Sequence, residues 1–143
     1  GNWVGITPLW FNEGMAEFLE RLEFQQNFAR ADAFSERIET LRSLARSGRL
    51  PDLRWLLTTE RKDWDRIGND IAYASAWSIV QFLIQNPKHQ QLVSEYLNRM
   101  SQHRCQPFDH KAFFEERYQG GLVAFDEDWR RWLVRERPTA VHF

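Results

Sequence analysis

The sequence predicts an all-α fold, a compact bundle of about six helices in a single domain over residues 1–143. Apolar side chains recur at the three- and four-residue spacing of helices along most of the chain. No stretch shows the sustained two-residue alternation of a half-buried strand. Residues 70–86 are apolar nearly all round, so this segment is expected to be the buried central helix.

Three helical segments are predicted before the central helix. The first covers residues 8–28, because Pro8 suits a first helical position and apolar side chains then recur about once per turn. The second runs from about Ile38 and is expected to stop near Gly48. A short third segment covers residues 51–59 and leads into a polar loop.

Three segments are also predicted after the central helix, which Pro87 should end. Residues 92–100 place their apolar side chains on one helical face, and the polar stretch 101–110 is predicted to be a loop. A short aromatic segment, 113–118, precedes a pair of glycines. The last helix is expected to start near Asp126.

Composition and charge exclude several classes of protein. Nineteen Lys and Arg face twenty Asp and Glu, and the net charge is −1, so the basic surface of a nucleic-acid binder is absent and no nucleic-acid partner is expected. No apolar run reaches the roughly 18–20 residues that span a bilayer, so no transmembrane segment is expected. The single cysteine, Cys105, excludes an internal disulfide.

The most informative motif is PLWFNEGMAE, residues 8–17. Gly14 inside a predicted helix costs about 1 kcal/mol relative to alanine, which suggests close approach by another element. Glu13 and Glu17 are one turn apart on the same face, where like charges repel unless a cation lies near them. A structural alternative stays open, because acids in the first turns are also favoured by the helix dipole.

This stretch resembles the P-x-W-x-N-E-G-x-A-E segment of the gluzincin zinc metallopeptidases, particularly the bacterial peptidase MA-like group, long catalogued as a domain of unknown function. In that superfamily an upstream helix bearing H-E-x-x-H supplies two histidine ligands and the general base. The resemblance implies that Glu13 is the third zinc ligand and that Glu17 hydrogen-bonds a ligand histidine. It also matches Tyr73, in YASAWSIVQFL, to a downstream tyrosine whose hydroxyl stabilises the oxyanion.

The sequence departs from that pattern because it contains no H-E-x-x-H, and no two of its four histidines are four residues apart. A catalytic zinc needs about three protein ligands and an open position for water. We therefore expect the chain to be the C-terminal helical part of a metallopeptidase-like catalytic domain, inactive in isolation and with zinc absent or weakly bound. In the intact parent, zinc would be the cofactor and a peptide or protein the substrate.

Other candidate residues have simpler interpretations. Tyr73 is equally explained as a core tyrosine whose hydroxyl is satisfied. His103, Cys105 and His110 lie close together in sequence, but their spacing matches no common zinc pattern and a solvated loop is predicted there. His89 follows Pro87 at a predicted helix start and is assigned no role.

A second class of function competes with the peptidase hypothesis. The chain could act as a non-catalytic helical protein-interaction module or a degenerate peptidase domain, holding a protein segment in an aromatic groove. A homodimer formed through exposed apolar surface around Met15 and Tyr73 is one way to cover such a groove. Similarity to exported bacterial proteins favours a secreted or periplasmic location.

Overall fold

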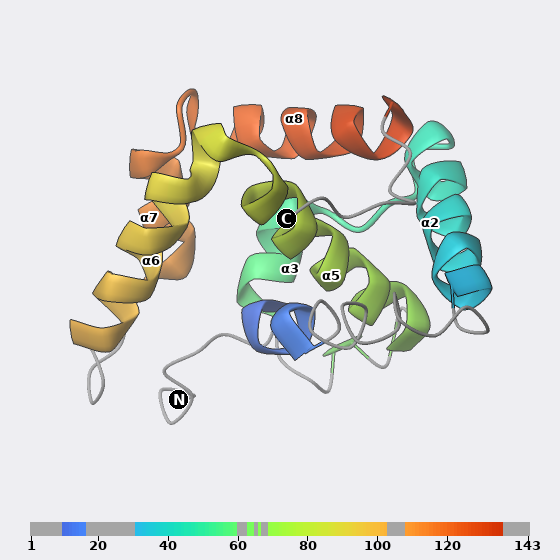
Figure 1. The fold of residues 1–143 in the computed structure, drawn as a ribbon, viewed down its shortest axis with the longest axis horizontal. Helices are drawn as coiled ribbons and strands as arrows, with labels where there is room; N and C mark the ends of the chain where they lie inside the picture. Colours follow the sequence, from blue (N-terminus) through green and yellow to red (C-terminus); the bar gives the residue numbers. More distant parts are fainter. Residues whose placement is uncertain are drawn as a thin grey trace.

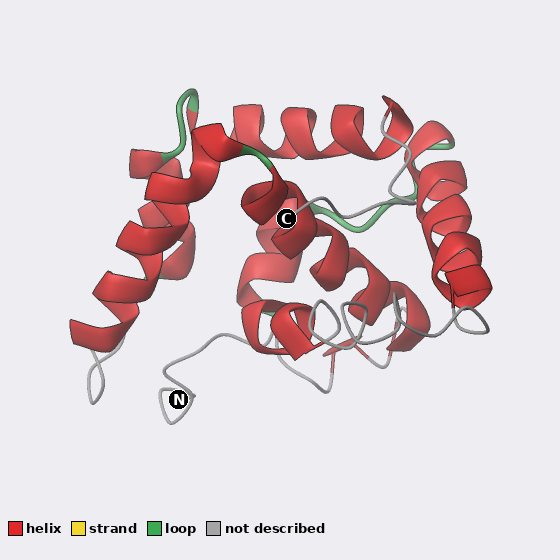
Figure 2. Ribbon diagram, viewed as in Figure 1, coloured by secondary structure: helices red, strands yellow, loops and turns green. Residues whose placement is uncertain are grey.

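The structure is a computed structural model that describes residues 10–16, 31–59, 63–64, 66, 69–102 and 108–135. Every regular element in these ranges is helical (Figure 2), so the predicted all-α fold class is confirmed. In chain order the helices are residues 10–16, α2 (Ala31–Arg46), α3 (Leu53–Thr58), α5 (Asn69–Gln85), the 3-10 turn η2 (Pro87–His89), α6 (Gln90–Gln102), α7 (His110–Arg117) and α8 (Gly121–Arg135).

The helices surround α5, as the sequence predicts. Figure 1 shows α8 along the top of the bundle, α2 at one side, and α6 and α7 at the other. Helix 10–16 lies on the side of the bundle away from α8. Contacts of α5 with α2, α6 and α8 place it at the centre of the packing.

The core follows from the composition of α5. Every residue from Ala74 to Leu83 is at most 4% exposed, including Trp77 and Phe82. A helix that is apolar all round can be buried on every side, and each large side chain that is removed from water contributes about 1.5–3 kcal/mol. The prediction of a buried central helix is confirmed.

Three polar contacts join α8 to the rest of the bundle. The indole of Trp129 donates from Nε1 to Ser78 Oγ on α5 at 3.0 Å, in a buried position. The guanidinium of Arg42 on α2 donates from Nε to the carbonyl of Leu133 at 3.0 Å, and Arg130 donates to the carbonyl of Pro51 at 3.2 Å. These bonds fix α8 against segments that are distant in sequence.

The predicted start of α8 differs from the structure. This helix begins at Gly121 and not near Asp126, because its first turn is capped from outside. The Glu115 carboxylate accepts the backbone N–H of Leu122 at 3.0 Å, and Gly121 has a φ of 74°. The sequence around the start therefore contains no local capping residue to mark it.

Other boundaries shift as well, and α2 begins at Ala31, seven residues before the predicted start near Ile38. The predicted loop 101–110 is shorter at both ends, since α6 continues through Gln102 and α7 begins at His110. Asp109 caps α7 by accepting the N–H of Ala112 at 2.9 Å. Of the predicted helix 8–28, residues 10–16 are helical and the remainder lies outside the described residues.

The close approach predicted at Gly14 is present. A Cβ atom placed on Gly14 would lie 2.6 Å from the carbonyl oxygen of Ala76 and 2.7 Å from Cγ2 of Val80. Both distances are far inside van der Waals contact. Helix 10–16 therefore crosses α5 backbone against backbone, at a point where only glycine fits.

We expect Gly14→Ala to lower the free energy of unfolding by about 1–3 kcal/mol, because overpacking forces the two helices apart. Asn12→Ala is the matched control, since Asn12 is exposed on the same helix. Urea denaturation followed by circular dichroism measures both. Equal stability of Gly14→Ala and the wild type would show that the crossing is not tight.

A second pair of variants tests the buried hydroxyl beneath α8. Ser78→Ala should lower the free energy of unfolding by about 1–3 kcal/mol, because it leaves the indole N–H of Trp129 buried without an acceptor. Ser75→Ala should cost little or stabilise slightly, because the Ser75 hydroxyl is buried and has no hydrogen-bond partner. The account would be contradicted if, in the same denaturation experiment, Ser75→Ala lowered the free energy of unfolding more than Ser78→Ala.

Candidate functional site

Two of the predicted site residues, Glu13 and Tyr73, lie on helices that touch. Glu13 precedes the glycine that contacts Ala76 of α5, and Tyr73 lies one turn before Ala76 on the same face of that helix. Both side chains are partly buried. The crossing at Gly14 therefore brings helix 10–16, the motif helix, against the part of α5 that carries Tyr73.

The ring of Tyr73 packs on a buried tryptophan. It meets Trp64 edge to face, with ring centroids 5.1 Å apart and an interplanar angle of 89°. Trp64 is fully buried, whereas Tyr73 is in part accessible. Such aromatic pairs restrict ring orientation and contribute about 0.5–1.5 kcal/mol beyond area burial.

Aromatic side chains of α6 and α7 hold the start of the motif helix. Trp10, which is fully buried, stacks on Tyr96 with centroids 6.0 Å apart and meets Phe114 edge to face at 5.9 Å. Phe11 adds an edge-to-face contact with Tyr96 at 5.4 Å. Residues two and three positions before Glu13 are thus fixed in the core, which positions the glutamate that follows them.

The hydroxyl of Tyr96 lies 3.0 Å from Nδ1 of His110, at the first position of α7. Burial lowers the pKa of His110 to about 4, against the weaker opposing effect of Asp109. Burial also raises the pKa of Tyr96 well above its usual value. At neutral pH the contact therefore joins a neutral phenol to a neutral imidazole, and the tautomer of the imidazole sets which of the two donates.

This placement corrects the prediction of a solvated loop at His110. The side chain packs within the aromatic cluster, edge to face on Phe108 at 4.9 Å. The sequence could not indicate this, because the partner Tyr96 is on another helix. His103 and Cys105, and also the predicted site residue Glu17, lie outside the described residues.

The described part of the chain does not by itself fit a zinc ion. No three His, Cys, Asp or Glu residues in it lie close enough together to hold a metal. Glu13 is one oxygen donor of the kind that zinc accepts, but a catalytic zinc needs about three protein ligands.

Residues 2–109 match the model of a family described as Protein of unknown function (DUF1570). The chain belongs to the DUF1570 family. No curated protein and no solved structure matches it significantly. The family segment contains Glu13, Glu17 and Tyr73, whereas α7 and α8 lie beyond its end.

No helix among those the structure describes has both the length and the apolar character needed to cross a membrane. This agrees with the absence of a transmembrane segment predicted from the sequence.

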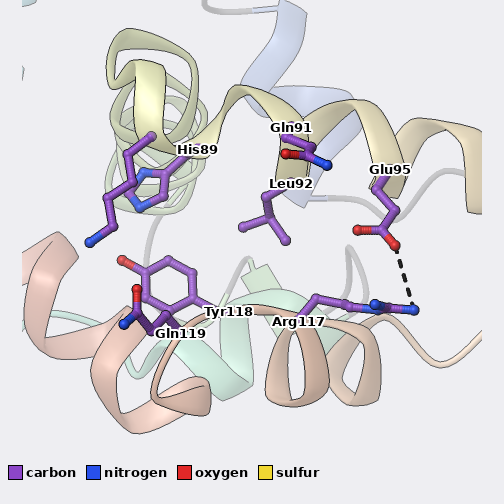
Figure 3. A pocket seen from close by; sticks show the side chains of 8 residues that line it. His89, Gln91, Leu92, Glu95, Arg117, Tyr118 and Gln119 are labelled. Carbon is purple, nitrogen blue, oxygen red and sulfur yellow. Dashed lines mark ion pairs between the residues drawn. The ribbon is translucent and has the colours of Figure 1, made fainter.

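A pocket of about 250 Å³ lies between η2 and the start of α6 on one side and the turn between α7 and α8 on the other (Figure 3). Its lining residues are Lys88, His89, Gln91, Leu92, Glu95, Arg117, Tyr118 and Gln119. They come from two segments that are more than twenty residues apart, so no local motif could indicate the pocket. His89, to which the sequence analysis assigns no role, is buried at the edge of this pocket.

The Tyr96–His110 pair predicts a pH dependence of stability. Because the pKa of His110 falls from 6.5 to about 4 on folding, the unfolded chain binds the proton first as the pH drops. The contribution of His110 to stability is therefore complete above pH 6.5 and is lost between pH 6.5 and about 4, by about 2 kcal/mol after a discount for the partial exposure of the side chain.

We expect His110→Gln to flatten this part of the stability curve, because glutamine does not titrate. Burial also lowers the pKa of His89, so a smaller dependence of the same sign should remain. Lys111→Gln, at the exposed neighbouring position, is the control. Urea midpoints measured from pH 7 to pH 4 decide the point, and parallel curves for His110→Gln and the wild type would contradict it.

Proposed function

We propose that this chain supplies the third zinc ligand, Glu13, and an oxyanion-stabilising tyrosine, Tyr73, to a gluzincin-type zinc peptidase. The two histidine ligands and the general base would come from an H-E-x-x-H segment outside residues 1–143. The chain alone would be inactive. The observation that carries the proposal is the Gly14 crossing, which sets the helix of Glu13 against the face of α5 that bears Tyr73.

The surroundings of Glu13 suit a ligand that must be held in place. The aromatic contacts of Trp10 and Phe11 fix the chain before Glu13, and the contact of Gly14 with Ala76 fixes the chain directly after it. A metal site requires ligands whose positions are supported by packing. A partly buried carboxylate on such a helix meets that requirement.

The surroundings of Tyr73 suit a hydrogen-bond donor. Its ring is oriented by Trp64, and the residue remains partly accessible. An oxyanion is stabilised by a donor that is fixed before the charge develops, and removing one such donor costs about 10²–10³ in kcat. In a peptidase of this type, zinc when bound activates the attacking water.

The interaction-module alternative rests on an apolar surface around Met15 and Tyr73. Both side chains are partly buried against the core. The exposed large apolar side chains in the described ranges are instead Leu97, Val123 and Val134, on α6 and α8. The homodimer stays a prediction that no described contact favours.

The proposal is tested in a protein that carries this chain behind an H-E-x-x-H segment. Glu13→Gln should weaken zinc binding by at least about 100-fold and abolish peptide hydrolysis. Mutating a residue that only hydrogen-bonds a metal ligand already lowers metal affinity by about 10–100-fold. Tyr73→Phe should keep the zinc and lower kcat about 10²–10³-fold. Bound zinc per chain and hydrolysis of a fluorogenic peptide are the two measurements.

Glu116→Gln, at an exposed position of α7, is the matched control and should change neither measurement. The 143-residue chain alone should bind zinc only substoichiometrically. Full zinc content and full activity in Glu13→Gln would reject the ligand assignment, and unchanged kcat in Tyr73→Phe would reject the role of the tyrosine.

A further inference from the structure

We propose that the pocket between the start of α6 and the α7–α8 turn binds a carboxylate joined to a small apolar group. Its ligand would be a short-chain or amino-acid-sized acid, or the C-terminal residue of a peptide. This site is independent of the proposed zinc site, because different elements build it.

Two walls form the pocket. Figure 3 shows His89, Leu92 and Glu95 on the wall made by η2 and α6, facing Arg117, Tyr118 and Gln119 on the other. The side chain of Leu92 points into the space between the walls. A volume of about 250 Å³ lies just under the roughly 300–1,000 Å³ of pockets for drug-sized ligands, so a small ligand fits.

One end of the pocket is apolar and fixed. The rings of His89 and Tyr118 pack together with centroids 5.2 Å apart, and the Tyr118 hydroxyl donates to Asp128 at 2.7 Å. Burial lowers the pKa of His89, so the imidazole is neutral at pH 7 and carries no charge into the pocket. With Leu92, these two rings offer a surface for an aliphatic side chain.

The other end carries the charge that selects an acid. Arg117 makes an ion pair with Glu95 through one terminal nitrogen, at 3.5 Å, and the two side chains are 44% and 35% exposed. Exposed pairs of this kind contribute only about 0–1 kcal/mol, and a guanidinium has five N–H donors. A ligand carboxylate can therefore bind Arg117 in the bidentate geometry that this side chain favours.

The balance of charge in the lining favours an anion over a cation. Lys88 and Arg117 are positive and Glu95 is the one carboxylate among the lining residues. Gln91 and Gln119 add neutral amide donors at the rim. A ligand ammonium would be repelled by Lys88 and Arg117, whereas a ligand carboxylate would be repelled only by Glu95, whose exposed side chain can change rotamer.

The pocket is well separated from Tyr73, and neither Glu13 nor Tyr73 lines it. The stretch of α5 from Tyr73 to Gln85 alone is about 18 Å long at 1.5 Å per residue, and the pocket begins beyond its end. Arg117 also lies outside the segment that matches the DUF1570 family. Failure of one proposal therefore leaves the other intact.

The test uses the 143-residue chain, titrated at low salt and pH 7 with N-acetylleucine, with nuclear magnetic resonance shifts as the readout. The uncharged N-acetylleucinamide should bind at least about tenfold more weakly than the acid, because it lacks the charge-assisted bonds to Arg117. A peptide that ends in leucine distinguishes the two sources. Tighter binding of the peptide than of N-acetylleucine indicates a peptide C-terminus, and equal binding indicates a free small acid.

Variants locate the effect. Arg117→Gln should lower the affinity for the acid by about tenfold or more. Glu95→Gln should raise this affinity, because the substitution removes the competing carboxylate. Arg54→Gln, at an exposed position of α3, should change nothing. Circular dichroism confirms that each variant is folded.

The proposal would be overturned by no binding of the acid or the peptide at millimolar concentration, by equal affinity for the acid and its amide, or by unchanged affinity in a folded Arg117→Gln variant. Weaker binding in Glu95→Gln would also contradict it, because the glutamate would then be a ligand contact and not a competitor.

Discussion

The contact between Gly14 and the backbone of Ala76 determines how the motif helix lies on the bundle. Without a side chain at position 14, the two helices approach until a Cβ atom would lie 2.6 Å from a carbonyl oxygen. That approach is closer than two helices with larger side chains at their crossing can make, since interaxial distance depends on the side chains at the contact. The relation between Glu13 and Tyr73 depends on this distance.

The aromatic cluster around Tyr96 complements that crossing. It joins the start of helix 10–16 to α6 and α7, so the motif is held both by a small residue against α5 and by large rings at its start. A neutral histidine at the edge of the cluster is hydrogen-bonded to the tyrosine hydroxyl, so the buried polar atom is paired. Packing and hydrogen bonding thus act on the same few residues.

Sequence reasoning succeeded where the signal is local. The composition of α5 predicts its burial, and the unusual glycine at position 14 predicts the close approach, because both effects act within a few residues. It failed where a distant side chain decides the outcome. Glu115 caps the start of α8 through Leu122, seven residues away, His110 is partly buried against Tyr96 of another helix, and the two walls of the pocket come from separate helices.

The position of α8 has a consequence for how the family is delimited. The segment that matches the family ends at residue 109, yet Phe125, Trp129 and Leu133 are fully buried beyond it. Arg42 bonds to Leu133 across a separation of 91 residues. A boundary drawn from sequence similarity therefore cuts through one packed core. A chain that is being synthesised cannot complete its core until α8 has emerged, and such distant contacts are made late because closing a long loop costs entropy.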